Sequence, residues 1–237
     1  MYIKLFQKGK TMLNKYNLNQ YNIELVPVND SHFYFDIKRD GTFRRILDLG
    51  DIEDSFIEKE TFEGCAFLWE VILPKNLQYV DEGVFKFCTS LKKIKFNENL
   101  EAIKENAFVC CIHLKKIVLS DKLLCIEDNA FEGCSSLHTV ILNENLKEIG
   151  HNVFKDCNIK RIILPKNLEH IPEDFLENQK HNERITVFAP DNIYKSVCKK
   201  LNSEKFCIKK DTIDDIIEEA SSFKDINRYI NLKNQQR

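Results

Sequence analysis

The hydrophobic positions in residues 53–175 recur with a period of 23 residues. In each unit a phenylalanine is followed by a cysteine, a leucine, a pair of alternating apolar residues, a second leucine and a closing Val or Ile. The two clearest columns are Phe62, Phe85, Phe108, Phe131 and Phe154, and Cys65, Cys88, Cys111, Cys134 and Cys157. A fixed period of about 20–29 residues predicts a solenoid, because one such repeat cannot bury its apolar face without a neighbour on which to stack.

The residues before the repeats alternate between apolar and polar, as half-buried strands do. Residues 22–28 and 32–37 are predicted to be strands joined by a turn at Asn29, Asp30 and Ser31, and Asp40 and Gly41 form a second turn before residues 43–49. Residues 44–49 also resemble the strand of a degenerate first repeat. We expect this β-meander to cover the open edge of the first repeat, which would otherwise invite aggregation.

The repeat period breaks down towards the C-terminus, as is typical of a capping unit. The sequence predicts a strand at 184–188, a helix from Pro190 to Leu201, and one more strand at 206–208. Thr212 to Asp215 reads as a capping box that opens a helix over 212–232, which is either a lid on the last repeat or a docking element for a partner. We expect four parts: a polar segment (1–20), the meander with the degenerate strand (21–49), the solenoid (50–188) and a C-terminal cap with helices (189–237).

Alternation within the repeat strands predicts which side chains point outwards. On the expected concave face, the basic positions are Lys93, Lys95, Lys116 and Arg161, and the apolar positions are Ile72, Val118, Ile141 and Ile163. Immediately before each expected strand, near the edge of this face, the sequence places Trp69, Lys92, Lys115, His138 and Lys160. Trp69 is either an anchor at the edge of this face or buried beneath the meander. A basic column beside exposed aliphatic residues fits a protein partner that is acidic and partly apolar.

Overall charge changes this picture little. The chain has 35 Lys and Arg against 37 Asp and Glu, a net charge of −2, so no general basic excess points to nucleic acid. The alternative of a polyanion or nucleic-acid binder therefore depends on the basic column alone. No apolar run approaches the roughly 18–20 residues of a membrane span. Residues 1–21 do not resemble a signal peptide, so we expect a cytoplasmic protein, with leaderless export or prior removal of a leader as the alternative.

Nine cysteines are an odd number, and five of them form one column. This pattern predicts a ladder of buried free thiols in a reducing compartment rather than a disulfide framework. A row of thiols cannot close a tetrahedral shell and no C-x-x-C pair is present, so we expect neither a metal nor another cofactor.

The chain also lacks the phosphate-binding, metalloprotease and nucleophile-elbow motifs, which predicts that it is not an enzyme. Cys134 and His138 are four residues apart, as a nucleophile and its base can be. We expect Cys134 to point into the core and His138 to point outwards, so that the two do not meet.

The repeated string, seen best from Phe131 through Cys134, Leu137 and Leu142 to Ile149, resembles the BspA-type leucine-rich repeat. The resemblance covers about residues 32–202 and implies a curved, β-rich α+β solenoid with strands on one face and turns or short helices on the other. The family includes adhesins and other protein-binding molecules, many of them secreted. The resemblance therefore implies recognition of a protein partner, with a secreted or surface adhesin or effector as the alternative. The sequence leaves the oligomeric state open.

Overall fold

The computed structural model describes residues 46–50, 55–66, 68–179, 184–201 and 204–210 with their side chains, and residues 23–29, 32–39 and 42–44 as backbone. The polar segment predicted at 1–20 and the helix predicted at 212–232 lie outside the described residues.

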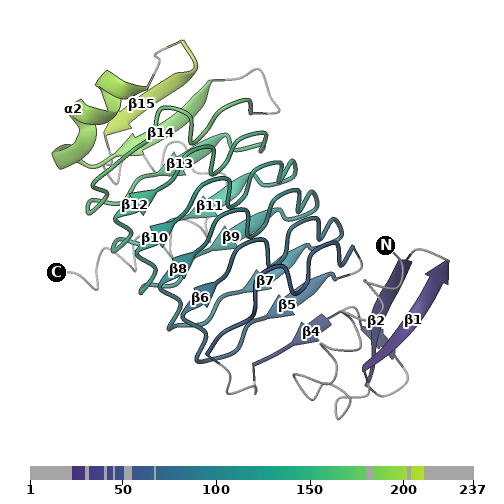
Figure 1. Ribbon diagram of the computed structural model, residues 1–237. Helices are drawn as coiled ribbons and strands as arrows, with labels where there is room; N and C mark the ends of the chain where they lie inside the picture. Colours follow the sequence, from purple (N-terminus) through teal and green to yellow (C-terminus); the bar gives the residue numbers. More distant parts are fainter. Residues whose placement is uncertain are drawn as a thin grey trace.

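One row of parallel strands runs the length of the solenoid (Figure 1). Its members are β4 (Ile46–Asp48), β5 (Glu70–Ile72), β7 (Lys93–Lys95), β9 (Lys116–Val118), β11 (Thr139–Ile141) and β13 (Arg161–Ile163). Pairing joins residues 23 positions apart, such as Glu70 with Lys93 and Lys116 with Thr139. The predicted stacking of 23-residue rungs is therefore confirmed.

A second row of parallel strands, which the sequence analysis did not predict, forms another side of the rungs. It consists of β6 (Tyr79–Val80), β8 (Ala102–Ile103), β10 (Cys125–Ile126) and β12 (Glu148–Ile149), in the order β12-β10-β8-β6. The closing Val or Ile of each repeat is the inward-facing residue of each short strand, as at Val80 and Ile103. Turns that carry the phenylalanines and cysteines complete each rung.

The phenylalanines form a continuous stack through the core. The ring centroids from Phe62 to Phe154 are 5.3, 5.3, 5.0 and 5.7 Å apart, and the planes of neighbouring rings are close to parallel. All five side chains are fully buried. Offset stacking at these spacings adds to the hydrophobic gain of burial.

The cysteine ladder lies beside the phenylalanines. Cys88, Cys111, Cys134 and Cys157 are buried, and each Sγ–H donates to the carbonyl of a phenylalanine on the preceding rung, at 3.2–3.3 Å. All nine cysteines are free thiols, and Cys65, the first of the column predicted to be buried, is only partly buried. Burial raises the pKa of the Cys88, Cys111 and Cys157 thiols well above the ordinary value, so they stay protonated and keep donating.

The two ends of the array differ. At the N-terminal end, β1 (Ile23–Asn29), β2 (His32–Arg39) and β3 (Thr42–Arg44) form an antiparallel sheet, which confirms the predicted meander, while its covering of the first rung stays a prediction. At the other end, β14 (Ile185–Ala189) and β15 (Phe206–Lys210) continue the parallel row from β13. The predicted helix is α2 (Asp191–Lys200), which follows Pro190 and buries Val197.

Candidate functional site

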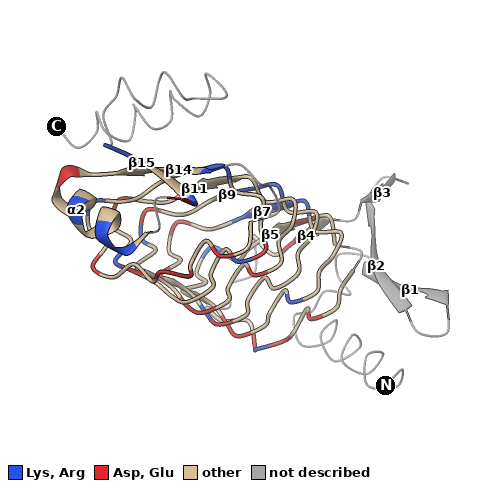
Figure 2. Cartoon of the chain, turned by 90° about the horizontal axis from the view of Figure 1, so that it is seen from above, with Lys and Arg blue, Asp and Glu red and all other residues tan. Residues whose placement is uncertain are grey.

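The predicted basic residues lie on one row of strands. Lys93 and Lys95 belong to β7, Lys116 to β9 and Arg161 to β13, and all four side chains are exposed. Figure 2 shows Lys and Arg on this row, and most Asp and Glu on another side of the rungs. We call this surface the basic strand face, made of the outward positions on and just before these strands. It comprises Trp69, Glu70, Ile72, Lys92, Lys93, Lys95, Lys115, Lys116, Val118, His138, Thr139, Ile141, Lys160, Arg161 and Ile163.

Trp69 marks the start of this face and is not buried. Its side chain is 43% exposed, and the Lys92 ammonium lies 4.0 Å from the centroid of its ring, close enough for a cation–π contact. Beside it, Lys93 Nζ lies 3.8 Å from a carboxylate oxygen of Glu70. Glu70 therefore partly neutralises the face at β5 and β7.

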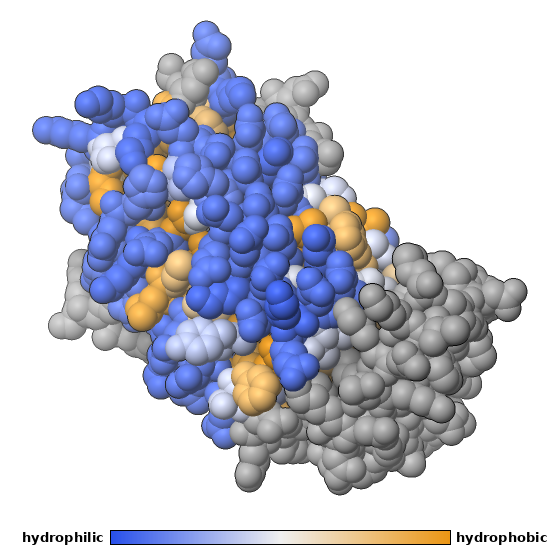
Figure 3. Space-filling view, viewed as in Figure 1, coloured by the Kyte–Doolittle hydropathy of each residue, from blue (hydrophilic) through white to orange (hydrophobic). Residues whose placement is uncertain are grey.

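The apolar residues predicted for this face are less exposed than expected. Ile72, Val118, Ile141 and Ile163 are only half-exposed, because the side chains on neighbouring rungs cover part of each. Figure 3 shows small separate hydrophobic patches rather than one continuous apolar surface on the side it views. The four apolar side chains of the basic strand face therefore offer less surface for contact than the sequence suggested.

Other large apolar residues are exposed outside this face, and the sequence analysis missed them. Phe87 is 43% exposed and Ile112 is 36% exposed, both on the turns that precede the basic strands. Phe87 holds a left-handed backbone (φ 59°) at a repeat position where Gly64 and Gly133 stand in other rungs. A bulky residue where the repeat prefers glycine was the sequence signal that could have identified Phe87.

The suggested cysteine–histidine pair is not formed. Cys134 is buried and its Sγ–H donates to the Phe108 carbonyl, whereas His138 is exposed and its Nδ1 lies 2.9 Å from the Thr139 hydroxyl oxygen. The two residues therefore have separate partners, as expected. Within the part of the chain that the structure describes, no three His, Cys, Asp or Glu side chains are grouped so that they could hold a metal ion.

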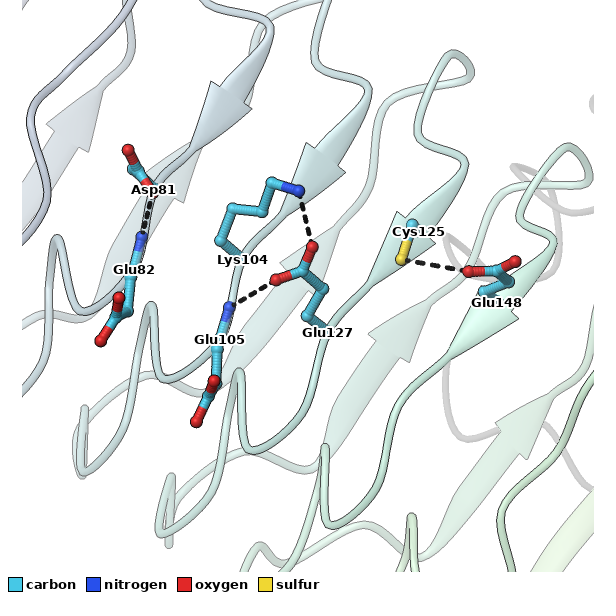
Figure 4. Close-up of polar contacts among 7 residues, drawn as sticks. All are labelled: Asp81, Glu82, Lys104, Glu105, Cys125, Glu127 and Glu148. Carbon is cyan, nitrogen blue, oxygen red and sulfur yellow. Dashed lines mark hydrogen bonds and ion pairs between the residues drawn. The ribbon is translucent and has the colours of Figure 1, made fainter.

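A second charged surface lies around β6, β8, β10 and β12, and we call it the acidic face (Figure 4). Its two lysines are paired within it: Lys104 Nζ lies 2.6 Å from Glu127 Oε1, and Lys147 Nζ lies 3.9 Å from Glu169. Glu127 also accepts a hydrogen bond from the Glu105 backbone N–H at 3.2 Å. The carboxylates of this face are Asp81, Glu82, Glu101, Glu105, Glu127, Asp128, Glu148 and Glu169.

A hollow of about 500 Å³ opens in the acidic face. Glu105, Glu127, Asp128, Glu148 and Glu169 are among the residues that line it. Cys125 also borders the hollow, and its Sγ lies 3.7 Å from Glu148 Oε2 (Figure 4). The hollow is therefore lined by carboxylates that come from successive rungs.

The environment of Cys125 suppresses its ionisation. Partial burial, followed by the charges of Glu148 and Glu127, raises its pKa from 9.0 to about 11. The thiolate that nucleophilic reagents require is therefore scarce at neutral pH.

We expect Cys125 to react with iodoacetamide about 100-fold more slowly at pH 8 than a thiol of ordinary pKa, because two pKa units separate them. Its rate should climb until the pH passes about 11. Glu148→Gln removes one of the two charges that hold the pKa up, so it should accelerate the reaction. Peptide mapping after timed alkylation measures this rate, and an unchanged rate in Glu148→Gln would contradict the role given to that carboxylate.

Comparisons with known proteins agree with the repeat architecture. The model of the BspA type leucine rich repeat region matches residues 55–183 as six copies, which is more than half of the chain. No match was found among the curated proteins. In the part of the chain that the structure describes, no helix is long and apolar enough to cross a membrane.

Three solved structures are similar to this chain. The leucine-rich repeat protein TpLRR of T. pallidum is 24% identical with a TM-score of 0.50, covering 80% of this chain and 95% of that one. The pneumococcal vaccine antigen PcpA is 23% identical with a TM-score of 0.50, covering 60% and 41%. A leucine-rich repeat protein from Bacteroides ovatus is 24% identical with a TM-score of 0.45, covering 64% and 32%.

The chain thus matches about a third of the B. ovatus chain and less than half of PcpA. At these identities the likeness shows the fold alone. The six matched copies, together with the stacked 23-residue rungs, establish the family: this chain belongs to the BspA-type leucine-rich repeat proteins.

Proposed function

We propose that this protein is a recognition module that binds an acidic protein partner on the basic strand face, which we take to be the concave side. Proteins built from this repeat are generally protein-interaction or surface-adhesin modules and are generally non-enzymatic. The observation that carries the proposal is the row of cations on successive rungs. It comprises Lys92, Lys93, Lys95, Lys115, Lys116, Lys160 and Arg161.

Stacking the rungs brings these like charges close together. Neighbouring strands lie about 4.8 Å apart, and two unit charges about 5 Å apart in water repel by about 0.8 kcal/mol. An acidic ligand laid along the row would relieve this repulsion and would also be steered towards it by long-range attraction. Because the charges are exposed, we expect salt to weaken binding strongly.

The apolar part of the proposed contact is small and local. Trp69 offers an exposed ring beside Lys92, and Ile72, Val118, Ile141 and Ile163 are half-exposed between the cations. A partner with a few aliphatic or aromatic side chains among its carboxylates fits this arrangement. Aromatic anchors of this type often contribute a large share of binding energy.

The same row of cations also supports the two alternatives. Phosphates of a nucleic acid would neutralise these cations as carboxylates do. The basic strand face also has the aromatic ring of Trp69, on which a base could stack. A role as a surface adhesin or effector would use the same face outside the cell, in line with PcpA being a vaccine antigen. Cell fractionation separates the cytoplasmic location that we expect from a surface location.

We expect the triple variant Lys93→Glu, Lys95→Glu and Lys116→Glu to bind an acidic probe at least about 10-fold more weakly, a loss of about 1.4 kcal/mol or more. The probes are a fluorescent synthetic peptide rich in Glu and Leu and a single-stranded oligonucleotide of equal charge. Fluorescence anisotropy across a range of salt concentrations measures both affinities. Tighter binding of the oligonucleotide, with a steep salt dependence, would replace the proposed partner by a nucleic acid.

The matched control reverses three lysines on the turns: Lys59→Glu, Lys86→Glu and Lys155→Glu. It changes the net charge by the same amount and leaves the basic strand face intact. If both variants lose peptide binding equally, overall charge is responsible and the proposed face is wrong. Thermal melts of both variants verify that the solenoid remains folded.

A further inference from the structure

The solenoid carries two large charged surfaces of opposite sign. The basic strand face has seven Lys and Arg residues against Glu70. The acidic face has eight carboxylates against Lys104 and Lys147, both of which are paired there, and Lys59 at its edge, which lies 3.9 Å from Glu82. The net charge of −2 conceals this separation, because the two surfaces nearly cancel.

We propose that the basic strand face of one copy docks on the acidic face of a second copy of this chain. Charge complementarity is the first argument. The donors that contact three of the acidic-face carboxylates are neutral groups: the Asn106 side chain on Glu105, the His151 backbone N–H on Asp128, and the Cys125 thiol on Glu148. These contacts leave the negative charges uncompensated and able to attract the lysines of another molecule.

Matched spacing is the second argument. Both surfaces are built from the same 23-residue unit, so each contributes residues at the same rise per rung. That rise is visible in the core, where stacked phenylalanine centroids are 5.0–5.7 Å apart. Once one lysine meets one carboxylate, the next rung therefore brings the next pair into range. Two unrelated charged surfaces would not keep this match over several rungs.

The hollow in the acidic face is a recess into which side chains of the second copy can fit. It has a volume of about 500 Å³, and Glu105, Glu127, Asp128 and Glu148 border it. Lysine side chains from a second copy can extend into such a recess with their charged ends among the carboxylates. Lys93, Lys95 and Lys116 are exposed on three-residue strands and are the side chains that we assign to it.

This contact uses different surfaces on the two copies, so the assembly is head-to-tail and open-ended. A dimer would still present one basic strand face and one acidic face, and further copies could add. Assembly would also cover the face to which we assign partner binding. The inference does not depend on that function, because self-association is measured with this protein alone.

Sedimentation and light scattering on the full chain test the inference. At about 0.01 M salt, where the screening length is about 30 Å, the weight-average mass should rise with protein concentration to at least about twice that of the monomer. At about 1 M salt, with a screening length of about 3 Å, the mass should return to that of the monomer. A wild-type protein that stays monomeric at low salt would refute the proposal, and a plateau at the dimer would refute the open-ended arrangement.

Charge-swapped variants identify the two surfaces. One variant carries Lys93→Glu, Lys95→Glu and Lys116→Glu, and the other carries Glu101→Lys, Glu105→Lys and Glu148→Lys. Each should be monomeric alone, since the altered surface then carries almost no net charge, and an equimolar mixture should recover association through the two unaltered surfaces. The control Lys59→Glu, Lys86→Glu and Lys155→Glu should still associate, because it removes no cation of the basic strand face and, by removing the Lys59 partner of Glu82, leaves the acidic face more negative. Association of either variant alone, or failure of the mixture while both variants remain folded, would overturn the assignment.

Discussion

Phe108→Ala is expected to lower the free energy of unfolding by about 3–5 kcal/mol, the usual cost of deleting a buried phenylalanine. Phe108 is fully buried, and its ring centroid lies 5.3 Å from that of Phe85 and 5.0 Å from that of Phe131. Phe96 also meets it edge-on at 6.0 Å. The neighbouring rings are held by their own rungs and cannot move in to fill the space, so a cavity remains in the middle of the stack.

Urea denaturation followed by circular dichroism measures this loss. The matched control is Phe87→Gly, which removes an exposed phenylalanine from the adjacent turn. Because Gly64 and Gly133 adopt the same left-handed backbone at this position, Phe87→Gly should be neutral or stabilising by up to about 1 kcal/mol. If the two changes lowered the free energy of unfolding equally, the buried phenylalanine stack would contribute no more to stability than one exposed ring.

Asn143→Ala is expected to lower the free energy of unfolding by about 1–3 kcal/mol, because the buried Leu123 carbonyl loses its donor and the Ser120 carbonyl keeps only the Leu123 N–H. Asn143 is 3% exposed, and its Nδ2 donates to the Ser120 carbonyl and, at 2.9 Å, to the Leu123 carbonyl. Asn97 makes the equivalent contacts to Pro74 and Leu77, at 2.7 and 2.9 Å. These asparagines donate to the backbone at the corner between the two rows of strands, beside the Leu77 and Leu123 N–H groups that donate to the Pro74 and Ser120 carbonyls.

Asn145→Ala is the control for this substitution. Asn145 also donates to a carbonyl of the preceding rung, that of Asp121 at 2.8 Å, but the contact is exposed to solvent. Water can replace it, so the expected cost is below about 1 kcal/mol. The same urea denaturation compares the two variants. A cost for Asn143→Ala no larger than that for Asn145→Ala would show that the corner carbonyls tolerate the loss of their donor.

Much of the basic strand face could be predicted from alternation in the sequence. Lys93, Lys95 and Lys116 are exposed on β7 and β9, as a period of two within each strand requires. The degree of exposure could not be predicted in the same way. Ile141 is only half-exposed because the residues that flank it belong to rungs on either side, and their side chains decide how much of it water can reach.

The acidic face was not predicted, for a related reason. Its strands, such as β8 (Ala102–Ile103), are two residues long, and two residues show no alternation that a sequence pattern could reveal. Glu105, Asp128 and Glu148 come from different repeats, and only stacking places them around one hollow. The contact between Lys92 and Trp69 likewise joins residues 23 positions apart.

The sequence by itself determined the structure of the single repeat and the fact that repeats stack. A 23-residue period with apolar residues at fixed places dictates a stacked solenoid, a phenylalanine column and a column of buried thiols, because these are the ways in which such a unit can bury its apolar face. The tertiary structure decided where charge accumulates. Stacking converts one position in each repeat into a continuous column, so the sign of each face depends on which repeats contribute a lysine or a carboxylate there and on which neighbours neutralise it.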